Sequence, residues 1–481
     1  MASGTIRRFK SELTAQIVNG ISSALLLISL ARLLSADDYG LLYLSISIFG
    51  LIGLFGSLGI ASSAAKYISE YRQKDEGQIP HIISISFKIC LLLSTTITIF
   101  VIILNKNLYM LLGEKGLGMV LLLGAPYILF FTLFRYSRKI LQGFEKISQA
   151  SMVKVIFDIG KLVFAVVLVA AGFQAEGGII GYVLGASVSS LVGLALVYRK
   201  YSKTDNVPIE TGLRRRIFEY SVPLTITQAA GRLDRRIDTV LVGFFLTPVA
   251  VSYYVISKQV VIFVQKPAAA LGFTLSPAFA AEKAANNNKK LSKMFELSVV
   301  NFLLFYIPAA AGLVLISEPL VTIVFGLKYS GAIPVIQVFS LYLILSSGNR
   351  VMANVLDFLG KAKARAYAKG AVSLLNVVLN VALIPRIGVV GAAYSTVAAQ
   401  MLYAIYNMHL VSSDVSIRYE YVARSMTKIL VITSVMTLVV LILRNEITGW
   451  ISLFIVIAAA VIVWGGLSIT AGLLNRQMIP N

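Results

Sequence analysis

Long apolar stretches separated by short polar segments run through this sequence from one end to the other. A helix needs roughly 20 mostly apolar residues to cross the hydrocarbon core of a bilayer. Stretches of that kind recur about 14 times along the chain. The pattern therefore predicts an all-α, polytopic membrane protein. The expected spans are approximately 13–34, 40–65, 80–104, 117–138, 152–171, 178–198, 217–246, 249–280, 295–316, 332–358, 365–385, 389–411, 426–443 and 448–470.

Lysine and arginine gather in every second segment between the expected spans. Cytoplasmic loops of membrane proteins are enriched in these residues, whereas outer loops are not. The alternation therefore predicts a multi-pass protein of the plasma or inner membrane with both termini in the cytoplasm. The basic residues of the expected inner segments include Lys66, Arg72, Lys74, Arg135, Arg138, Lys139, Lys146, Arg214, Arg215, Arg216, Lys361, Arg365, Arg418 and Arg424.

Two of the expected inner segments are longer and more polar than the rest, and they suggest a division of the chain. The first follows the sixth span and the second follows the twelfth. We therefore expect a lobe of six spans over 1–200, a second lobe of six spans over 201–412, and two further spans over 413–481.

The beginnings of the two expected lobes resemble each other. Sliding the chain by 212 residues aligns Gln16 with Gln228 and Leu34 with Leu246. Because six is an even number of spans, the two lobes should share one orientation. We expect them to be related by an axis along the membrane normal.

Charged residues interrupt the expected span 217–246. Each Arg or Asp at the centre of a membrane helix costs roughly 2.5–3.5 kcal/mol, so such side chains must face water or a ligand of opposite charge. With about 3.6 residues per turn, the three arginines fall on one side of the helix and the aspartates lie beside them. The pattern predicts an anion-binding site. Its residues are Arg232, Asp234, Arg235, Arg236 and Asp238.

Two other interpretations of this cluster stay open from sequence alone. Arg235 and Asp238 are three residues apart and can pair within the helix. Alternatively, the helix begins only at Ile237, which would leave the arginines at the cytoplasmic surface as topology anchors. The late start would break the alignment with the first span, so we rank it below a cavity site.

We expect a wet cleft between the two lobes, and other cations at membrane depth are candidates for its lining. We expect the first, second, seventh and eighth spans to line it, because the first and seventh spans are equivalent in the repeat. Lys258, Lys266 and Arg350 would add positive charge there. Long lysine side chains can instead snorkel along the wall of a helix towards water.

One carboxylate lies within the fifth expected span. Asp158 and Lys161 are three residues apart and can form a self-neutralised structural pair. The alternative is a role for Asp158 in coupling to H+ or Na+, because intramembrane carboxylates serve ion relays. Gln16 and Asn19 are the polar residues of the first span that could support such a site.

Composition narrows the class of protein further. The 481 residues are 57% hydrophobic and 14% charged, with a formal net charge of +21, which excludes a soluble protein. The positions of the basic residues follow the topology rule, so we expect no nucleic-acid partner. A single cysteine, Cys90, allows no intrachain disulfide. The two histidines, His81 and His409, are far apart in sequence, and we expect no metal site and no cofactor.

Three short motifs resemble the multidrug/oligosaccharidyl-lipid/polysaccharide (MOP) exporter superfamily, and within it the Wzx-type polysaccharide flippases. They are the segments 31–40, 141–143 and 236–243, which read ARLLSADDYG, LQG and RIDTVLVG. The resemblance implies two six-helix lobes, a cationic central cavity and alternating access. The sequence departs from the family at Ser252, where a glycine is common. The first span offers Gln16 and Asn19 but no buried aspartate, which counts against a cation-coupled drug exporter.

The resemblance and the arginine cluster together predict a function. We expect a flippase that moves a polyprenyl- or dolichyl-(di)phosphate-linked oligosaccharide from the cytoplasmic to the outer leaflet, acting as a monomer among membrane lipids. A multidrug or peptidoglycan-precursor exporter of the same superfamily is the alternative. A membrane glycosyltransferase or ligase is less favoured, because the only adjacent acidic pair in an expected outer loop, Asp37 and Asp38, lies in a short turn.

Overall fold

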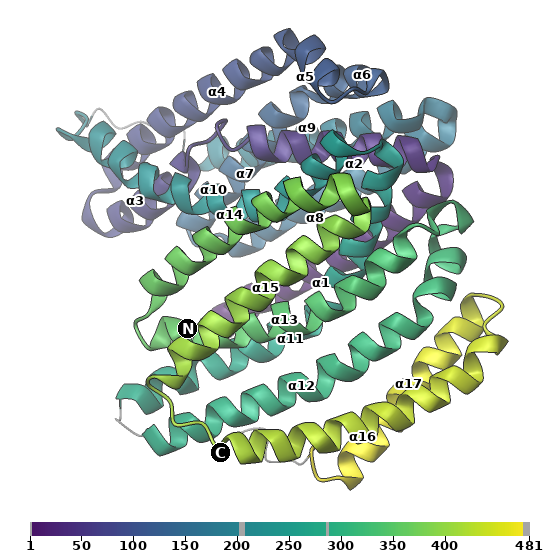
Figure 1. Cartoon of the computed structure of the whole chain (residues 1–481). Helices are drawn as coiled ribbons and strands as arrows, with labels where there is room; N and C mark the ends of the chain where they lie inside the picture. The colour runs from purple at the N-terminus through teal and green to yellow at the C-terminus, as the bar shows by residue number, and fades with distance from the viewer. Residues whose placement is uncertain (1, 202–206, 285–287, 475–481) are drawn as a thin grey trace. The chain divides into compact units, whose positions relative to one another are not determined.

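The computed structural model describes residues 2–201, 207–284 and 288–474 of the chain (Figure 1). Every regular element in these ranges is helical, so the predicted all-α class is confirmed there. Contacts divide the chain into two compact units, Met1–Val251 and Ser252–Asn481.

The first unit contains ten α-helices and two short helical turns among the residues that the structure describes, and α11 begins at its end. The elements are α1 (Ala2–Leu33), α2 (Ala36–Ile52), α3 (Ile60–Lys74), η1 (Glu76–Gln78), α4 (Ile79–Ile103), α5 (Asn105–Leu111), α6 (Lys115–Gly124), α7 (Pro126–Gly143), α8 (Ile147–Leu168), η2 (Val169–Phe173), α9 (Gln174–Tyr201) and α10 (Leu213–Phe245).

The second unit continues from α11 to the last helix. Its elements are α11 (Pro248–Ala284), α12 (Asn288–Pro319), η3 (Leu320–Phe325), η4 (Leu327–Tyr329), α13 (Ala332–Phe358), α14 (Ala362–Ile387), α15 (Val389–Ser412), α16 (Tyr419–Leu443), η5 (Arg444–Glu446) and α17 (Trp450–Thr470).

Within the described ranges, ten helical segments are long and apolar enough to cross a membrane, or eleven if the bent pair α6 and α7 crosses as one span. The chain is therefore a multi-pass membrane protein. Its ten or eleven candidate spans are fewer than the fourteen expected, and two features of the helices account for part of the difference. The 53-residue segment Ile147–Arg199 contains both α8 and α9 and counts once. α10 is not among the ten, and it carries five charges between positions 232 and 238. The fourteen-span topology and the two-lobe symmetry stay predictions.

The expected span 40–65 is wrong as a single helix, because α2 ends at Ile52 and α3 begins at Ile60. Gly59 lies between them with a φ of +71°, and a Cβ at this position would come within 2.7 Å of the Ser221 carbonyl oxygen. Only glycine combines this left-handed conformation with so close an approach. The Ser63 hydroxyl donates to the Ile217 carbonyl at 2.8 Å, which fixes the start of α3 against α10.

The late start proposed for the seventh span is also wrong. α10 is helical from Leu213 to Phe245, with Gly212 in the left-handed region before its first turn. Pro223 lies inside the helix without ending it. The arginines at 232–236 are therefore part of a long helix rather than of a segment that precedes it.

Glycines bring α8 and α9 into close contact. The chain reverses through η2, where Gly172 has a φ of +94°. A Cβ on Gly181 would come within 2.3 Å of the Ala165 Cα, and one on Gly185 would come within 2.6 Å of the Lys161 amide nitrogen. Small residues four apart are a standard way for membrane helices to pack backbone against backbone.

Polar side chains link α1 to α8 along their length. Ser11 donates to Ser148 at 3.0 Å, Ser151 donates to Glu12 at 2.7 Å, and Asn19 donates to Asp158 at 2.9 Å. The partners are 137 or 139 residues apart in sequence at every step. A nearly constant separation means that the two helices run parallel, so neither can slide without breaking these hydrogen bonds.

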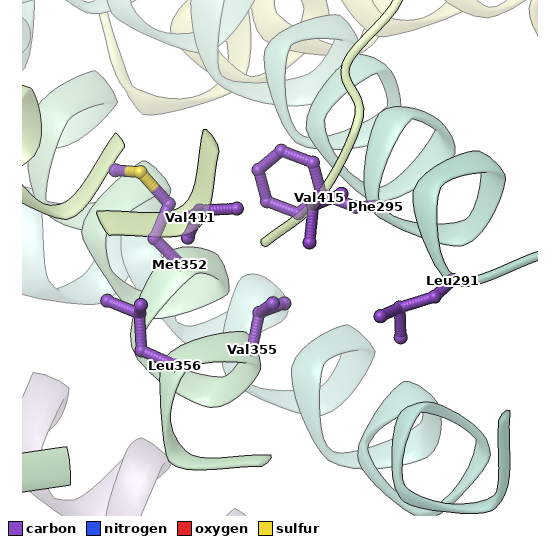
Figure 2. Packing of buried hydrophobic residues seen from close by; sticks show 7 residues of the cluster. All are labelled: Leu291, Phe295, Met352, Val355, Leu356, Val411 and Val415. Atoms are coloured by element: carbon purple, nitrogen blue, oxygen red, sulfur yellow. The ribbon is translucent and has the colours of Figure 1, made fainter. Parts of the chain in front are cut away.

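In the second unit, α16 and α17 pack along α12 (Figure 1). The Trp464 indole donates to the Leu304 carbonyl at 3.0 Å, and Arg418 makes bidentate contact with the buried Glu296 carboxylate. A compact apolar cluster lies beside this ion pair, with side chains from α12, α13, α15 and the following loop (Figure 2). The cluster consists of Leu291, Phe295, Met352, Val355, Leu356, Val411 and Val415.

Candidate functional site

The first unit encloses a cavity of about 240 Å³ between α2, α3, α7 and α10. Ser57 and Gly59, in the turn between α2 and α3, form part of its wall. Among the residues that the structure describes, the lining includes lysine and arginine but no Asp or Glu, so the formal charges that they place on the wall are all positive. The cationic residues are Arg135, Lys139, Arg232, Arg235 and Arg236.

α10 contributes the three arginines that the sequence singled out. With Gln228 they follow the spacing of one helix face, which is why a single helix can present all of them to one cavity. Arg236 reaches furthest towards α2: a Cβ on Gly50 would lie 3.3 Å from its Nε. The absence of a side chain at position 50 leaves room for the arginine. The structure thus brings the predicted arginines together, although their ligand remains a proposal.

Three buried tyrosines lie within electrostatic range of Arg236 in the first unit. Arg236 interacts electrostatically with Tyr43 of α2, Tyr127 of α7 and Tyr182 of α9. These neutral groups can orient the arginine without cancelling its charge. Arg236 therefore keeps its positive charge available to the cavity.

α7 contributes two cations that sequence reasoning assigned only to topology. Arg135 and Lys139 line the cavity on the same helix face as Tyr127 and Phe131, each four residues from the next. Arg135 lies within electrostatic range of the like-charged Arg235 of α10. The regular spacing on α7 is the sequence signal that could have identified both cations as part of a site.

The two aspartates of α10 do not line this cavity. Asp238 is 2% exposed and Asp234 is half-buried. Their positions leave the cavity wall cationic. This cavity lies within the first unit, so the cleft expected between the two lobes, lined by the first, second, seventh and eighth spans, stays a prediction.

Asp158 lies at the centre of a separate buried cluster. Its carboxylate accepts from Lys161 at 2.8 Å, from Lys154 at 3.1 Å and from Asn19 at 2.9 Å. The pairing with Lys161 was predicted, and the structure adds a second lysine and an amide from α1. Gln16 is exposed on α1. The cluster is therefore a polar junction between α1 and α8 that leaves one net positive charge.

The other predicted cations belong to the second unit. Lys258 is half-buried, with its ammonium 5.3 Å from the centre of the Tyr254 ring. Lys266 is exposed and its ammonium lies 5.2 Å from the Phe263 ring centre. Arg350 is exposed on α13. Their part in a head-group site stays a prediction.

The second unit has its own cavity of about 520 Å³, and its wall is mostly apolar. His409, Ser412 and Tyr419 supply its polar atoms. The apolar lining residues are Val299, Phe302, Gly348, Val351, Met352, Ala404, Ile405 and Met408. In the described ranges, no three His, Cys, Asp or Glu residues gather as a metal site would require.

The fold is that of transporters of the MOP superfamily. A solved structure of the lipid II flippase MurJ in an inward closed conformation matches with a TM-score of 0.76 and 17% identity, over 97% of this chain and 99% of that one. An inward-facing multidrug resistance MATE family transporter of the MOP superfamily matches with a TM-score of 0.68 and 15% identity, over 82% and 95%. At these identities the likeness establishes the fold alone.

The sequence comparisons are more specific. The model of the polysaccharide biosynthesis protein family matches residues 7–282, more than half of the chain, so this protein belongs to that family. The probable low-salt glycan biosynthesis flippase Agl15 of Haloferax volcanii is 24% identical over 391 residues, covering 81% of this chain and 80% of its own. The lipid II flippase MurJ of Bacillus subtilis is 23% identical over 459 residues, covering 84% of each.

These findings confirm the resemblance inferred from the three short motifs. Two of the relatives and both solved structures are described as flippases or transporters. The chain therefore belongs to the polysaccharide biosynthesis protein family and has the fold of such transporters.

Proposed function

We propose that this protein moves a polyprenyl- or dolichyl-(di)phosphate-linked oligosaccharide from the cytoplasmic to the outer leaflet by alternating access. The observation that carries the proposal is the cavity of the first unit, whose charged lining residues are all cationic. The similarity to a glycan biosynthesis flippase supports the same substrate class.

The physical task explains why a flippase needs such a wall. A phosphate that crosses the hydrocarbon unaided loses its hydration and has no partner, which is prohibitive. A wet, positively charged cavity replaces that hydration while the lipid tail stays in the bilayer. Arginine suits this role because its planar fork donates paired hydrogen bonds to phosphate oxygens.

The positive charge of this cavity disfavours a multidrug exporter more than it disfavours an exporter of a peptidoglycan precursor. A wall of lysine and arginine repels the cationic drugs that a multidrug exporter would carry. A peptidoglycan precursor carries the same phosphate chemistry as a lipid-linked glycan, and the relative MurJ flips lipid II. Transport of lipid II and of a lipid-linked oligosaccharide therefore has to be measured side by side.

The proposal extends to groups outside this cavity. Lys258, Lys266 and Arg350 of the second unit would receive the head group at another stage of the cycle. Asp158 is the candidate for coupling to H+ or Na+, supported by Gln16 and Asn19 of α1. Both termini would be cytoplasmic and the monomer would be the working unit.

The decisive experiment measures flipping in proteoliposomes. Arg232→Gln and Arg236→Gln remove charge but keep hydrogen-bonding groups, and Arg215→Gln is the matched control on an exposed part of the same helix. Loss of one charge-assisted bond of about 1.5–3 kcal/mol should lower affinity for the lipid-linked glycan roughly ten- to a hundredfold. Lysine at position 232 or 236 should restore part of it, because it returns the charge without the fork.

Two results would contradict the proposal. One is unchanged transport in the Arg232→Gln, Arg236→Gln double variant with normal expression. The other is transport of lipid II, but of no lipid-linked oligosaccharide, by the wild-type protein.

A further inference from the structure

One face of α3 is joined to the first turns of α10 by polar side chains. Ser63 donates to the Ile217 carbonyl at 2.8 Å, and Tyr67 donates to the Arg216 carbonyl at 3.2 Å. One turn further along α3, the Tyr71 hydroxyl accepts from the Arg216 guanidinium at 2.9 Å. All three side chains of α3 are buried. They are four residues apart, so α3 presents a continuous polar stripe to α10.

The segment that leads into α10 is fastened to the same corner of the first unit. The Gln78 side chain donates to the Pro208 carbonyl at 2.9 Å and accepts from the Glu210 amide at 3.0 Å. The Tyr71 hydroxyl donates to the Glu210 carboxylate. Segment 207–212 is therefore held along α3 and η1 before the chain enters α10.

These contacts end at the edge of the cationic cavity. A Cβ on Gly59 would come within 2.7 Å of the Ser221 carbonyl oxygen, which lies one turn beyond Ile217. Gly59 also lines the cavity, together with Ala61 and Ser62 at the start of α3. The polar stripe therefore closes the gap between α3 and α10 directly beside the cavity.

The bonds to α10 can open without leaving a buried carbonyl unpaired. The Ile217 carbonyl also accepts from the Ser221 hydroxyl of its own helix at 2.7 Å. Carbonyls inside an α-helix keep their intrahelical bonds as well. Losing the donor from α3 therefore costs little on the side of α10. Once the two segments part, the hydroxyls of Ser63 and Tyr67 can bond to water instead.

α10 has a weak point directly after these contacts. Pro223 has no N–H to bond the Glu219 carbonyl, and such positions are where helices bend most readily. The contacts with α3 lie at Ser221 or earlier. The cavity-lining residues Gln228 and Arg232 lie after the proline. The first turns of α10 can therefore swing while the arginines stay on the cavity wall.

We propose that residues 207–222 form a latch, which is closed on α3 in this structure and swings about Pro223 to open the cationic cavity. Ser63, Tyr67 and Tyr71 hold the latch closed. The latch controls access to the cavity rather than the choice of ligand, so this inference goes beyond the proposed function.

The test measures how fast a water-soluble maleimide labels a cysteine inside the cavity of the full-length protein in nanodiscs. The parent protein carries Ala61→Cys, because Ala61 is 8% exposed and lines the cavity, and Cys90→Ala removes the native buried thiol. Tyr71→Phe removes the hydroxyl that binds the latch. Tyr220→Phe is the matched control: its ring packs against Tyr67, but within the described part of the chain its hydroxyl forms no hydrogen bond.

Tyr71→Phe should speed labelling about tenfold, because its hydroxyl bonds two charged side chains of the closed latch. Tyr220→Phe should label at the rate of the parent. Pro223→Ala should slow labelling, because alanine restores the bond to the Glu219 carbonyl and stiffens the hinge. A thermal melt of each variant establishes that it is folded.

Three results would overturn the inference. The first is labelling of the parent as fast as that of a protein with Glu70→Cys, an exposed position on α3. The second is an equal rate for Tyr71→Phe and Tyr220→Phe. The third is faster labelling in Pro223→Ala. Because the assay contains no lipid substrate, a failure of the latch is distinguishable from a failure of the proposed function.

Discussion

The cavities of the two units differ in the chemistry of the side chains that line them. The larger one, in the second unit, is lined mostly by apolar side chains. The smaller one, in the first unit, is lined by lysine and arginine and, within the described part of the chain, by no carboxylate. Like charges collected at one site weaken a fold unless a ligand supplies the opposite charge. The buried carboxylates of Asp158 and Glu296 lie beside cationic partners that hold the structure together, whereas the cationic wall of the first unit suits the anion that we propose as its ligand.

The largest effect should come from removing such a carboxylate. Asp158→Asn would leave Lys154 and Lys161 close together without their shared counter-charge. Breaking a buried ion pair in this way should cost about 3–5 kcal/mol. Asp357→Asn is the control, because its pair with Arg365 is partly exposed and should be worth about 0–1 kcal/mol. The measurement is thermal unfolding in a mild detergent.

The same variant also tests the coupling hypothesis. If Asp158→Asn unfolds at the wild-type temperature but transports without regard to an H+ or Na+ gradient, Asp158 is a coupling group rather than a structural one. Loss of stability together with retained gradient dependence would support the structural role.

The next largest effect should come from a glycine at a close helix contact in the first unit, compared with a glycine in open space in the second unit. Gly181→Ala would push a methyl group against the Ala165 backbone, and overpacking of this kind costs roughly 1–3 kcal/mol. Gly370 lies within α14 of the second unit and a Cβ there would meet nothing within 4 Å. Gly370→Ala should therefore raise stability by up to about 1 kcal/mol. Equal responses of the two variants in thermal unfolding would disprove the assigned contacts.

A smaller, stabilising effect is expected from the removal of one charge in the cationic cavity. Arg135→Gln removes a positive charge that is disfavoured by its burial and, to a smaller extent, by the nearby Arg235, so the substrate-free protein should gain about 0.5 kcal/mol of stability. Arg424→Gln should lose a little, because Arg424 pairs with Glu420 on the exposed face of α16. Differential scanning fluorimetry of both variants without lipid substrate makes the measurement. A clear loss of stability in Arg135→Gln would show that the arginine is structural.

The smallest effect concerns the segment that leads into α10. Hydrogen bonds from the Tyr71 hydroxyl and then from Arg216 hold the pKa of Glu210 below its ordinary value of 4.5. Because the pKa is lowered by folding, this contact is complete above pH 4.5 and is lost as the pH falls through the lowered pKa. Amide hydrogen exchange at 207–212 should show protection at pH 7 that disappears in more acidic buffer. Glu210→Gln should remove that pH dependence.

The sequence predicted the helical class and the arginines because both are local properties. Apolar length identifies a membrane helix, and spacing along one helix places Arg232 and Arg236 on one face. The break between α2 and α3 was missed, because the glycines between them lie in a continuous apolar run and Gly59 is required by its contact with α10. Arg135 and Lys139 were missed because cations near an inner loop also satisfy the topology rule.

Partners on other helices could not be predicted from one sequence. The pair of Asp158 and Lys161 follows from spacing within α8, but the amide of Asn19 reaches Asp158 only because α1 runs parallel to α8. The lysine at 154 lies four residues before Asp158, and its contribution was overlooked beside the closer Lys161. Long-range contacts of this kind depend on helix packing, which hydropathy does not encode.

The length of α10 bears on the kind of bilayer that this protein needs. Its 33 residues extend about 50 Å, whereas a hydrocarbon core is about 30 Å thick. With the edge of the core near Phe245, as the expected span 217–246 places it, Arg236 would lie about 14 Å along the helix, close to the midplane. The first turns of α10, before Pro223, then extend beyond the lipid tails. A thicker or thinner membrane would shift the arginines away from the midplane, so lipid chain length should itself regulate transport.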